Sequence, residues 1–145
     1  MKLILSSCDF LNEKSKKVIL NNLPKPIGEC RVLFIPNEKS NKEAIQNGKY
    51  CGWLVRDGFS EENCFVFDRE EPDKFKDLDI DCLFISGGNT FLILDDLRKC
   101  GFDKEIIRYI KSGVTYIGGS AGAHIVTGDI SHVAKYDEPP EGFDN

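Results

Sequence analysis

Short, continuously apolar runs alternate with longer amphipathic segments along most of this chain. The runs Val32–Ile35 and Cys82–Ile85 contain no polar side chain. A strand with one solvated face alternates apolar and polar residues, whereas a parallel strand covered on both faces is apolar throughout. Because helical patterns separate the runs, their order predicts a right-handed, doubly wound α/β fold, in which helices cover both faces of a mostly parallel sheet.

The same alternation predicts where the elements lie. Strands are expected at residues 2–6, 31–36, 63–67, 82–86 and 115–118. Helices are expected at residues 13–23, 40–57, 90–99, 103–112 and 121–126. Asp103 is the expected N-cap of the fourth helix, because a short acidic side chain there accepts backbone N–H bonds. In the third helix Phe91, Leu94 and Leu97 form the predicted buried face, and residues 135–145 show no clear element.

Length and charge restrict the class of protein. The 145 residues suit one domain, which is expected to span residues 1–145. A formal net charge of −5 argues against nucleic acid or an anionic membrane as the main partner. No apolar run approaches the roughly 20 residues of a membrane span, and the apolar N-terminal stretch is too short for a signal peptide.

The cysteine spacing indicates free thiols. The six cysteines lie at positions 8, 30, 51, 64, 82 and 100. No two are close enough to form a Cys-x-x-Cys pair, so neither a metal site nor a redox pair is expected. Cys8, Cys30, Cys64 and Cys82 fall in or beside expected strands, where a free thiol behaves as a small hydrophobe. Reduced thiols without an export signal indicate a cytoplasmic protein.

Residues 114–122 carry the strongest indication of chemistry. A β-branched run leads into Gly-Gly-Ser-Ala-Gly, and helix-permissive residues follow. A Gly-x-Ser-x-Gly pattern between a strand and a helix is typical of a nucleophile elbow, which holds the serine out from the sheet edge. Glycine is expected at Gly118 and Gly122 because the turn leaves no room for a Cβ atom. Ser120 is therefore the predicted catalytic nucleophile.

A second glycine-rich loop, residues 86–90, also leaves the carboxyl end of an expected strand. If that strand neighbours the strand before Ser120, the backbone N–H groups of Gly88 and Ala121 can converge above the serine. Two such donors form an oxyanion hole, which a tetrahedral acyl-transfer intermediate requires. The candidate substrate contacts in this loop are Gly87 and Asn89.

Other interpretations of these features stay open. Asn89 or Thr90 can simply cap the following helix, and the Ser120 turn is also typical of a close-packed junction or a phosphate cradle. A general base for the serine would have to be one of the two histidines, His124 or His132. His124 lies one helical turn after the serine, where a structural role is expected. No carboxylate at a suitable spacing orients either histidine.

Two motifs together resemble a known family. Residues 87–91 read Gly-Gly-Asn-Thr-Phe before a leucine-rich helical pattern, and residues 116–123 read Tyr-Ile-Gly-Gly-Ser-Ala-Gly-Ala. In this order they resemble the serine peptidase family of dipeptidase E and cyanophycinase. The resemblance implies a three-layer α/β/α fold similar to class I glutamine amidotransferases and to flavodoxin. It also implies a Ser120 nucleophile, an oxyanion hole at Gly88 and Ala121, and no cofactor or metal. The implied substrates are small peptides, including dipeptides with N-terminal aspartate.

The resemblance does not assign the general base. In that family the base is a histidine in a Pro-His context on a later strand, beyond the region matching residues 126–145, and the acidic partner also lies outside the elbow. No residue here matches that histidine, so the chain is expected to form about the N-terminal two thirds of the domain. Alone, it is expected to be weakly active or inactive.

Two alternatives from other functional classes stay open. One is a non-catalytic, flavodoxin-like module that binds a small anion or a nucleotide at the two glycine-rich loops. The other is a self-associating pseudo-enzyme, a homodimer in which an uncovered sheet edge pairs with a second copy.

Overall fold

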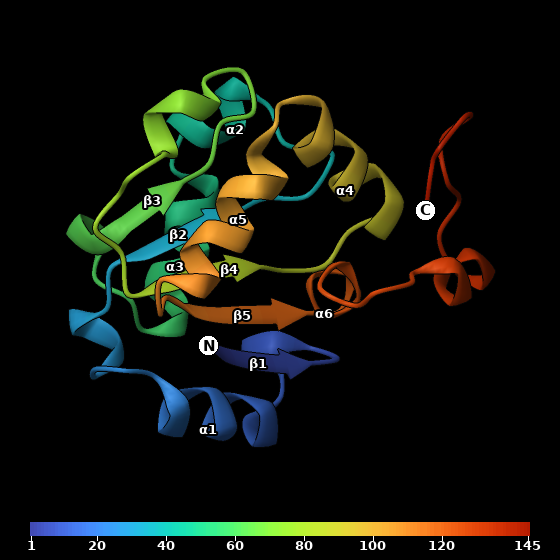
Figure 1. Ribbon diagram of the computed structural model, residues 1–145. Coiled ribbons are helices and arrows are strands. Elements are labelled where there is room, and N and C mark those ends of the chain that lie inside the picture. Colours follow the sequence, from blue (N-terminus) through green and yellow to red (C-terminus); the bar gives the residue numbers. More distant parts are fainter.

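The strands form one sheet in the order β1-β5-β4-β2-β3, as Figure 1 shows for the computed structural model, which describes residues 1–145. All four pairings are parallel. Each strand lies within one residue of its predicted bounds, so the doubly wound α/β fold is confirmed. The strands are β1 (Lys2–Ser6), β2 (Val32–Ile35), β3 (Cys64–Val66), β4 (Cys82–Ile85) and β5 (Thr115–Gly119).

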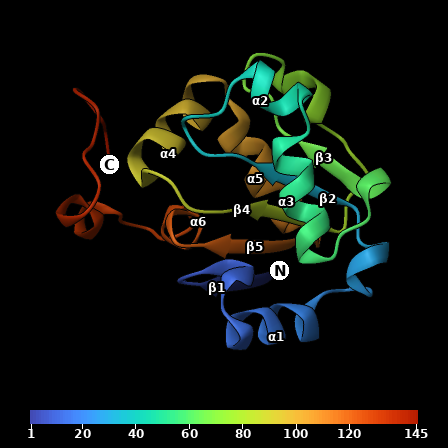
Figure 2. The ribbon, with the colours of Figure 1, turned by 180° about the vertical axis from the view of Figure 1, so that it is seen from behind.

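Helices cover both faces of the sheet, as the two opposite views show (Figures 1 and 2). One face carries α1 (Glu13–Asn22), α2 (Lys42–Gln46) and α3 (Lys49–Asp57), and the other carries α4 (Thr90–Lys99) and α5 (Phe102–Lys111). The short helix α6 (Ala121–Ile125) follows β5 directly. Crossovers from β1 to β2 and from β4 to β5 run in opposite directions, so right-handed connections place their helices on opposite faces. No helix combines the length and the apolar character needed to cross a bilayer.

The central strands β2 and β4 explain the continuously apolar runs. Leu33 and Leu83 point into the core under α4 and α5, where both are fully buried. Phe34 and Phe84 point to the opposite face, and their ring centroids lie 5.2 Å apart. Both faces of each strand therefore need apolar side chains, as the pattern predicted.

The predicted helix over residues 40–57 is wrong in one respect, because it is two helices. The first, α2, is capped by the side chain of Asn41, which accepts a hydrogen bond from the N–H of Ala44 at 2.8 Å. It ends at Gln46 with Asn47 as its C-cap, and Gly48 then takes a left-handed conformation with φ of 79° before α3 begins. A left-handed residue interrupts helical hydrogen bonding, and glycine adopts it without a Cβ penalty.

The predicted N-cap at Asp103 is also wrong. Gly101 is the N-cap residue of α5, with a left-handed φ of 73°, and the helix begins at Phe102. Phe102 is completely buried and its ring centroid lies 4.3 Å from that of Phe67. The earlier start turns this aromatic ring into the core, and Asp103 then lies within the first turn.

The C-terminal segment changes which face of α4 is buried. Ile93 and Leu97 pack into the main core, whereas Phe91 and Leu94 pack against the segment that follows α6. The predicted face of Phe91, Leu94 and Leu97 therefore divides between two clusters. Residues 135–145 contain no helix or strand beyond the end of the 3-10 turn Ser131–Lys135, yet they return to α4.

The cysteines behave as the sequence predicted. All six are free thiols. Cys30 and Cys82 are fully buried, while Cys8 and Cys64 are partly buried. Burial raises the pKa of the Cys64 thiol to about 12. A thiol with so high a pKa stays neutral and unreactive near pH 7.

Two helical glycines provide a test of the close packing of α6. We expect Gly122→Ala to lower the free energy of unfolding by about 1–3 kcal/mol, because its Cβ would overlap the backbone carbonyl of Ile85, which cannot move aside. Gly52→Ala in α3 is the matched control, since a Cβ there meets no atom within 4 Å. The control is expected to raise the stability by up to about 1 kcal/mol. Urea denaturation measures both, and equal effects of the two changes would contradict the packing described here.

Candidate functional site

The site lies at the carboxyl ends of β4, β5 and β1, where open α/β sheets bind their ligands. β4 and β5 are hydrogen-bonded neighbours, and Ile85 pairs with Gly118 in their register. The condition for bringing the two glycine-rich loops together is therefore met. β1 flanks β5 on its other side, with Ser6 paired to Gly119.

Ser120 occupies a strained turn at the centre of this edge. All five residues of β5 are buried, Ser120 is exposed, and α6 begins at the next residue. The serine has φ of 48° and ψ of −114°. Such a conformation costs a non-glycine residue on the order of 1–3 kcal/mol and is concentrated at functional sites. The Ser120 N–H donates to the Ser6 carbonyl at 2.9 Å, which anchors the turn to β1.

The glycines around Ser120 let the backbones of β5, α6 and β4 approach one another closely. A Cβ on Gly118 would lie 2.5 Å from the Gly122 carbonyl oxygen, and one on Gly122 would overlap the Ile85 carbonyl. The buried Tyr116 side chain contacts the same turn, and its hydroxyl donates to the Gly122 carbonyl at 2.6 Å. The expectation that the turn has no room for side chains at Gly118 and Gly122 is confirmed.

The second loop lies directly beside the serine. A Cβ on Gly87 would be 3.9 Å from Ser120 Oγ, so this loop borders the nucleophile position. Gly88 follows with φ of 147°, a conformation that other residues rarely adopt. Ala121 is the first residue of α6, where a backbone N–H has no intrahelical acceptor. The structure thus places the Gly87–Gly88 loop and the start of α6 beside Ser120, and an oxyanion hole formed by the N–H groups of Gly88 and Ala121 stays a prediction.

Asn89 has the capping role that the sequence left open. Its side-chain oxygen accepts a hydrogen bond from the Leu92 N–H at 3.1 Å at the start of α4. Its side-chain nitrogen donates to the Glu138 carbonyl at 3.0 Å. Asp137 adds a second contact from the same segment, because its carboxylate accepts the Thr90 N–H at 2.8 Å. A contact of Asn89 with substrate stays a prediction.

The two candidate bases contact each other. His124 Nδ1 and His132 Nε2 are 3.2 Å apart, and the ring centroids are 5.1 Å apart. Neither ring is hydrogen-bonded to Ser120 Oγ. A catalytic role for either histidine therefore stays a prediction, and the geometry does not bring one to the serine. No group of three or more His, Cys, Asp or Glu side chains is placed to hold a metal ion.

The sequence motifs did not identify Asp9, a buried carboxylate at this edge of the sheet. It follows β1, lies against Gly119, and has an exposed fraction of only 7%. Ser86 Oγ donates to Asp9 Oδ2 at 2.5 Å, whereas Asp9 Oδ1 has no hydrogen-bond partner. Burial raises the pKa of this carboxyl, the nearby Asp57 adds to the rise, and the Ser86 hydrogen bond opposes it. An acidic residue three positions after the end of the first strand was the available sequence signal, but its partner Ser86 lies 77 residues away in the sequence.

A cavity of about 310 Å³ opens beside this carboxylate. Asp9 and Ser86 border it near the site, and α3 supplies Trp53 and Arg56. Its other walls are mainly apolar. The remaining lining residues are Phe10, Leu11, Phe34, Leu54, Asp57 and Phe84.

The raised pKa of Asp9 predicts a pH effect on stability. Between the ordinary value of 3.8 and the raised folded value, the folded protein holds more protons than the unfolded chain. The free energy of unfolding therefore falls as the pH rises through this range. Asp9→Asn removes this titration, so wild type should lose stability relative to the variant as the pH rises from about 3.8. Urea denaturation from pH 4 to 7 measures the difference, and a constant or opposite trend would refute the assignment.

Several bacterial proteins are similar to part of this chain. An "Uncharacterized peptidase Lin0382" from Listeria innocua is 42% identical over 59 residues, which cover 41% of this chain and 28% of that protein. A "Peptidase E" from Citrobacter koseri is 38% identical over 69 residues, which cover 46% of this chain and 29% of that protein. The matched segments thus span less than a third of the length of these relatives.

Similarity to a solved structure and to a family profile extends over nearly the whole chain. The crystal structure of a "Putative Peptidase E Protein" from Listeria monocytogenes EGD-e matches with a TM-score of 0.71 and 27% identity. The match covers 95% of this chain and 68% of that one. The profile described as Peptidase family S51 matches residues 3–144. With the Ser120 turn and the adjoining glycine loop in place, this match shows that the chain belongs to peptidase family S51.

Proposed function

We propose that this chain carries the nucleophile and the oxyanion donors of a serine peptidase that acts on small peptides. One observation carries the proposal. Ser120 is the exposed residue of a strained strand–helix turn, and it borders the Gly87–Gly88 loop in a chain of peptidase family S51. Backbone strain that holds a serine out of a buried strand is typical of an activated nucleophile.

The proposed reaction has two steps. Ser120 Oγ attacks the peptide carbonyl carbon, its proton passes to a base, and a tetrahedral oxyanion forms. The C–N bond then breaks, the amine leaves with a proton, and water hydrolyses the resulting serine ester. The N–H groups of Gly88 and Ala121 would stabilise the oxyanion, and each such donor contributes about 100- to 1000-fold in kcat.

We propose that residues 1–145 alone turn over slowly. Neither histidine of these residues is bonded to Ser120, so the base of the first step is missing from the observed contacts. Catalysis without triad partners retains roughly 10³–10⁴-fold acceleration over water, which comes from the oxyanion hole and binding.

The proposed substrates are dipeptides with N-terminal aspartate. The resemblance of the two glycine motifs to dipeptidase E suggests this class.

A fluorophosphonate probe tests the nucleophile. We expect the probe to label wild type slowly at Ser120, because the strained turn and the proposed oxyanion donors remain while no base is bonded to the hydroxyl, and Ser120→Ala to lose the label completely. Ser112→Ala is the matched control, since this serine is exposed at the end of α5 and its hydroxyl bonds only to the Tyr109 carbonyl. Intact-protein mass spectrometry measures labelling. Equal labelling of wild type and Ser120→Ala would rule out the proposed nucleophile, and stabilisation by nucleotides without labelling would favour the anion-binding alternative.

Dipeptide hydrolysis tests the substrate class and the slow turnover. We expect Asp-Leu to be cleaved faster than Lys-Leu or Leu-Leu, with a kcat well below the typical enzyme value of about 10 s⁻¹. Ser120→Ala should abolish the difference between dipeptides. Amine release, followed by chromatography, measures the rates. Preference for Lys-Leu would contradict the aspartate assignment, and a kcat near the typical value would contradict the missing base.

A further inference from the structure

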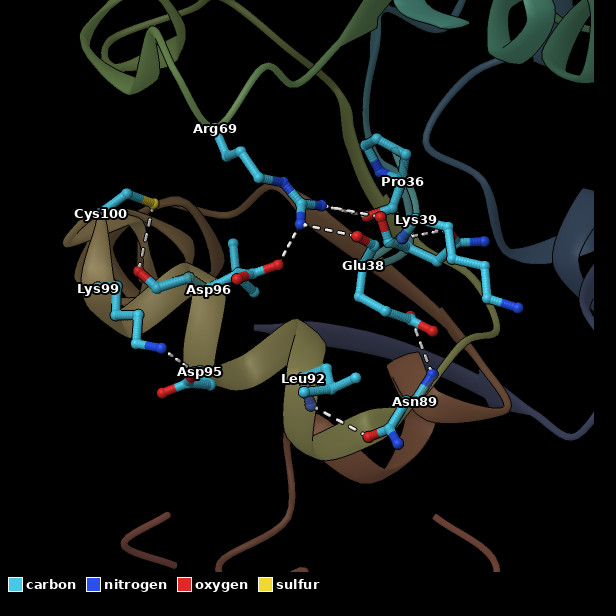
Figure 3. Close-up of polar contacts among 12 residues, drawn as sticks. Pro36, Glu38, Lys39, Arg69, Asn89, Leu92, Asp95, Asp96, Lys99 and Cys100 are labelled. Carbon is cyan, nitrogen blue, oxygen red and sulfur yellow. Dashed lines mark hydrogen bonds and ion pairs between the residues drawn. The ribbon is translucent and has the colours of Figure 1, made fainter. Parts of the chain in front are cut away.

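Three loops that leave β2, β3 and β4 contact one another at the carboxyl end of the sheet, and Figure 3 shows the polar contacts between them. Of the three, the loop after β4 borders Ser120. The loop after β2 contains Glu38, the loop after β3 contains Arg69, and the loop after β4 contains Gly88 and Asn89. None of the sequence motifs pointed to Glu38 or Arg69. Their contacts extend the site beyond the two glycine-rich loops.

Arg69 fastens the β2 loop to helix α4. One guanidinium nitrogen donates to the carbonyl oxygens of Asn37 at 2.8 Å and Pro36 at 3.5 Å. The other donates to the Glu38 carbonyl at 3.4 Å and forms an ion pair with the Asp96 carboxylate of α4. Arginine suits this task because its planar fork holds several donors in fixed directions. The backbone of the β2 loop is thus held at three successive residues (Figure 3).

Glu38 reaches from this fastened loop to the glycine loop. Its Oε2 accepts a hydrogen bond from the Asn89 N–H at 3.0 Å (Figure 3). The contact fixes the peptide plane between Gly88 and Asn89. In a capping box the carboxylate that accepts the N-cap N–H comes from the same helix, whereas here it comes from a loop 51 residues away.

Gly88 packs closely against the β2 loop and against α4. A Cβ on Gly88 would lie 2.6 Å from Glu38 Oε2, 2.7 Å from Asn37 Cβ and 2.9 Å from Ile93 Cδ1. Glycine is the residue with the most backbone freedom, so a free Gly87-Gly88 pair would sample many orientations. The β2 loop and α4 together exclude most of them and leave the observed φ of 147°.

We propose that Glu38, held by Arg69, is a positioning residue that orients the N–H of Gly88 toward the oxyanion formed at Ser120. This inference rests on the proposed function. Oxyanion donors stabilise a transition state only when they are already oriented, because reorganisation during the reaction would cost the energy they supply. Glu38 touches no reacting atom. It fixes the Gly88–Asn89 peptide through the Asn89 N–H, and the restricted φ of Gly88 then sets the direction of the Gly88 N–H, which belongs to the preceding peptide.

Reaction of Ser120 with the fluorophosphonate probe tests the proposal. During this reaction negative charge develops on the phosphonyl oxygen, which takes the place of the carbonyl oxygen of a peptide substrate. We expect Glu38→Ala to lower the maximal labelling rate by about 10- to 100-fold, because displacement of a catalytic group by about 1 Å costs a rate factor of this order. The half-saturating probe concentration should change less than about threefold. Glu38→Asp, which is one methylene too short to reach Asn89, should show the same loss. Glu38→Gln keeps the acceptor and the length, so its rate should stay within about threefold of wild type. Lys39→Ala, an exposed neighbour in the same loop, is the control.

Amide hydrogen exchange of Asn89, measured by NMR, gives a second readout that needs no catalysis. Protection of this amide should be lost in Glu38→Ala and Glu38→Asp and retained in Glu38→Gln. Lost protection with unchanged labelling would overturn the positioning role and leave the proposed function intact. A slow Glu38→Gln variant with a protected amide would also overturn it. Absence of Ser120 labelling in wild type would instead overturn the proposed function, and the positioning role with it.

Discussion

The contact between the start of α6 and the end of β4 is the constraint on which the rest of the site depends. Gly122 lies so close to the Ile85 carbonyl that no side chain fits between them. This approach forces the chain to reverse within one residue, and Ser120 is the residue that absorbs the strain. Because β4 and β5 are neighbours, the same contact also brings the Gly87–Gly88 loop to the serine.

Two carboxylates border the site, one at the end of β5 and one at the glycine loop before α4. Asp9 lies beneath Gly119 and bonds to Ser86, while Glu38 bonds to the Asn89 N–H. Each carboxylate is attached to backbone or to a hydroxyl beside a glycine loop. Asp9 is buried, where its hydrogen bond to Ser86 is stronger than in water, and Glu38 is half-buried. The glycine loops are flexible by composition, and these side chains restrict them.

Particular residues show why some features were predictable and others were not. The runs Val32–Ile35 and Cys82–Ile85 identified the central strands, because burial on both faces leaves a purely local pattern. The break at Gly48 was missed, since glycine in a helical pattern is compatible with both continuation and interruption. The early start of α5 at Phe102 was missed because a core contact, here with Phe67, decided it.

The sequence by itself determined the order of strands and helices, the turn at Ser120 and the glycine loop before α4, because each depends on neighbouring residues. Only the tertiary structure decided that β5 lies between β1 and β4. That arrangement brings Asp9 to Ser86, 77 residues away, and it leaves His124 bonded to His132. Crossover connections set which strand ends meet, and no local pattern of side chains records the partner across such a connection.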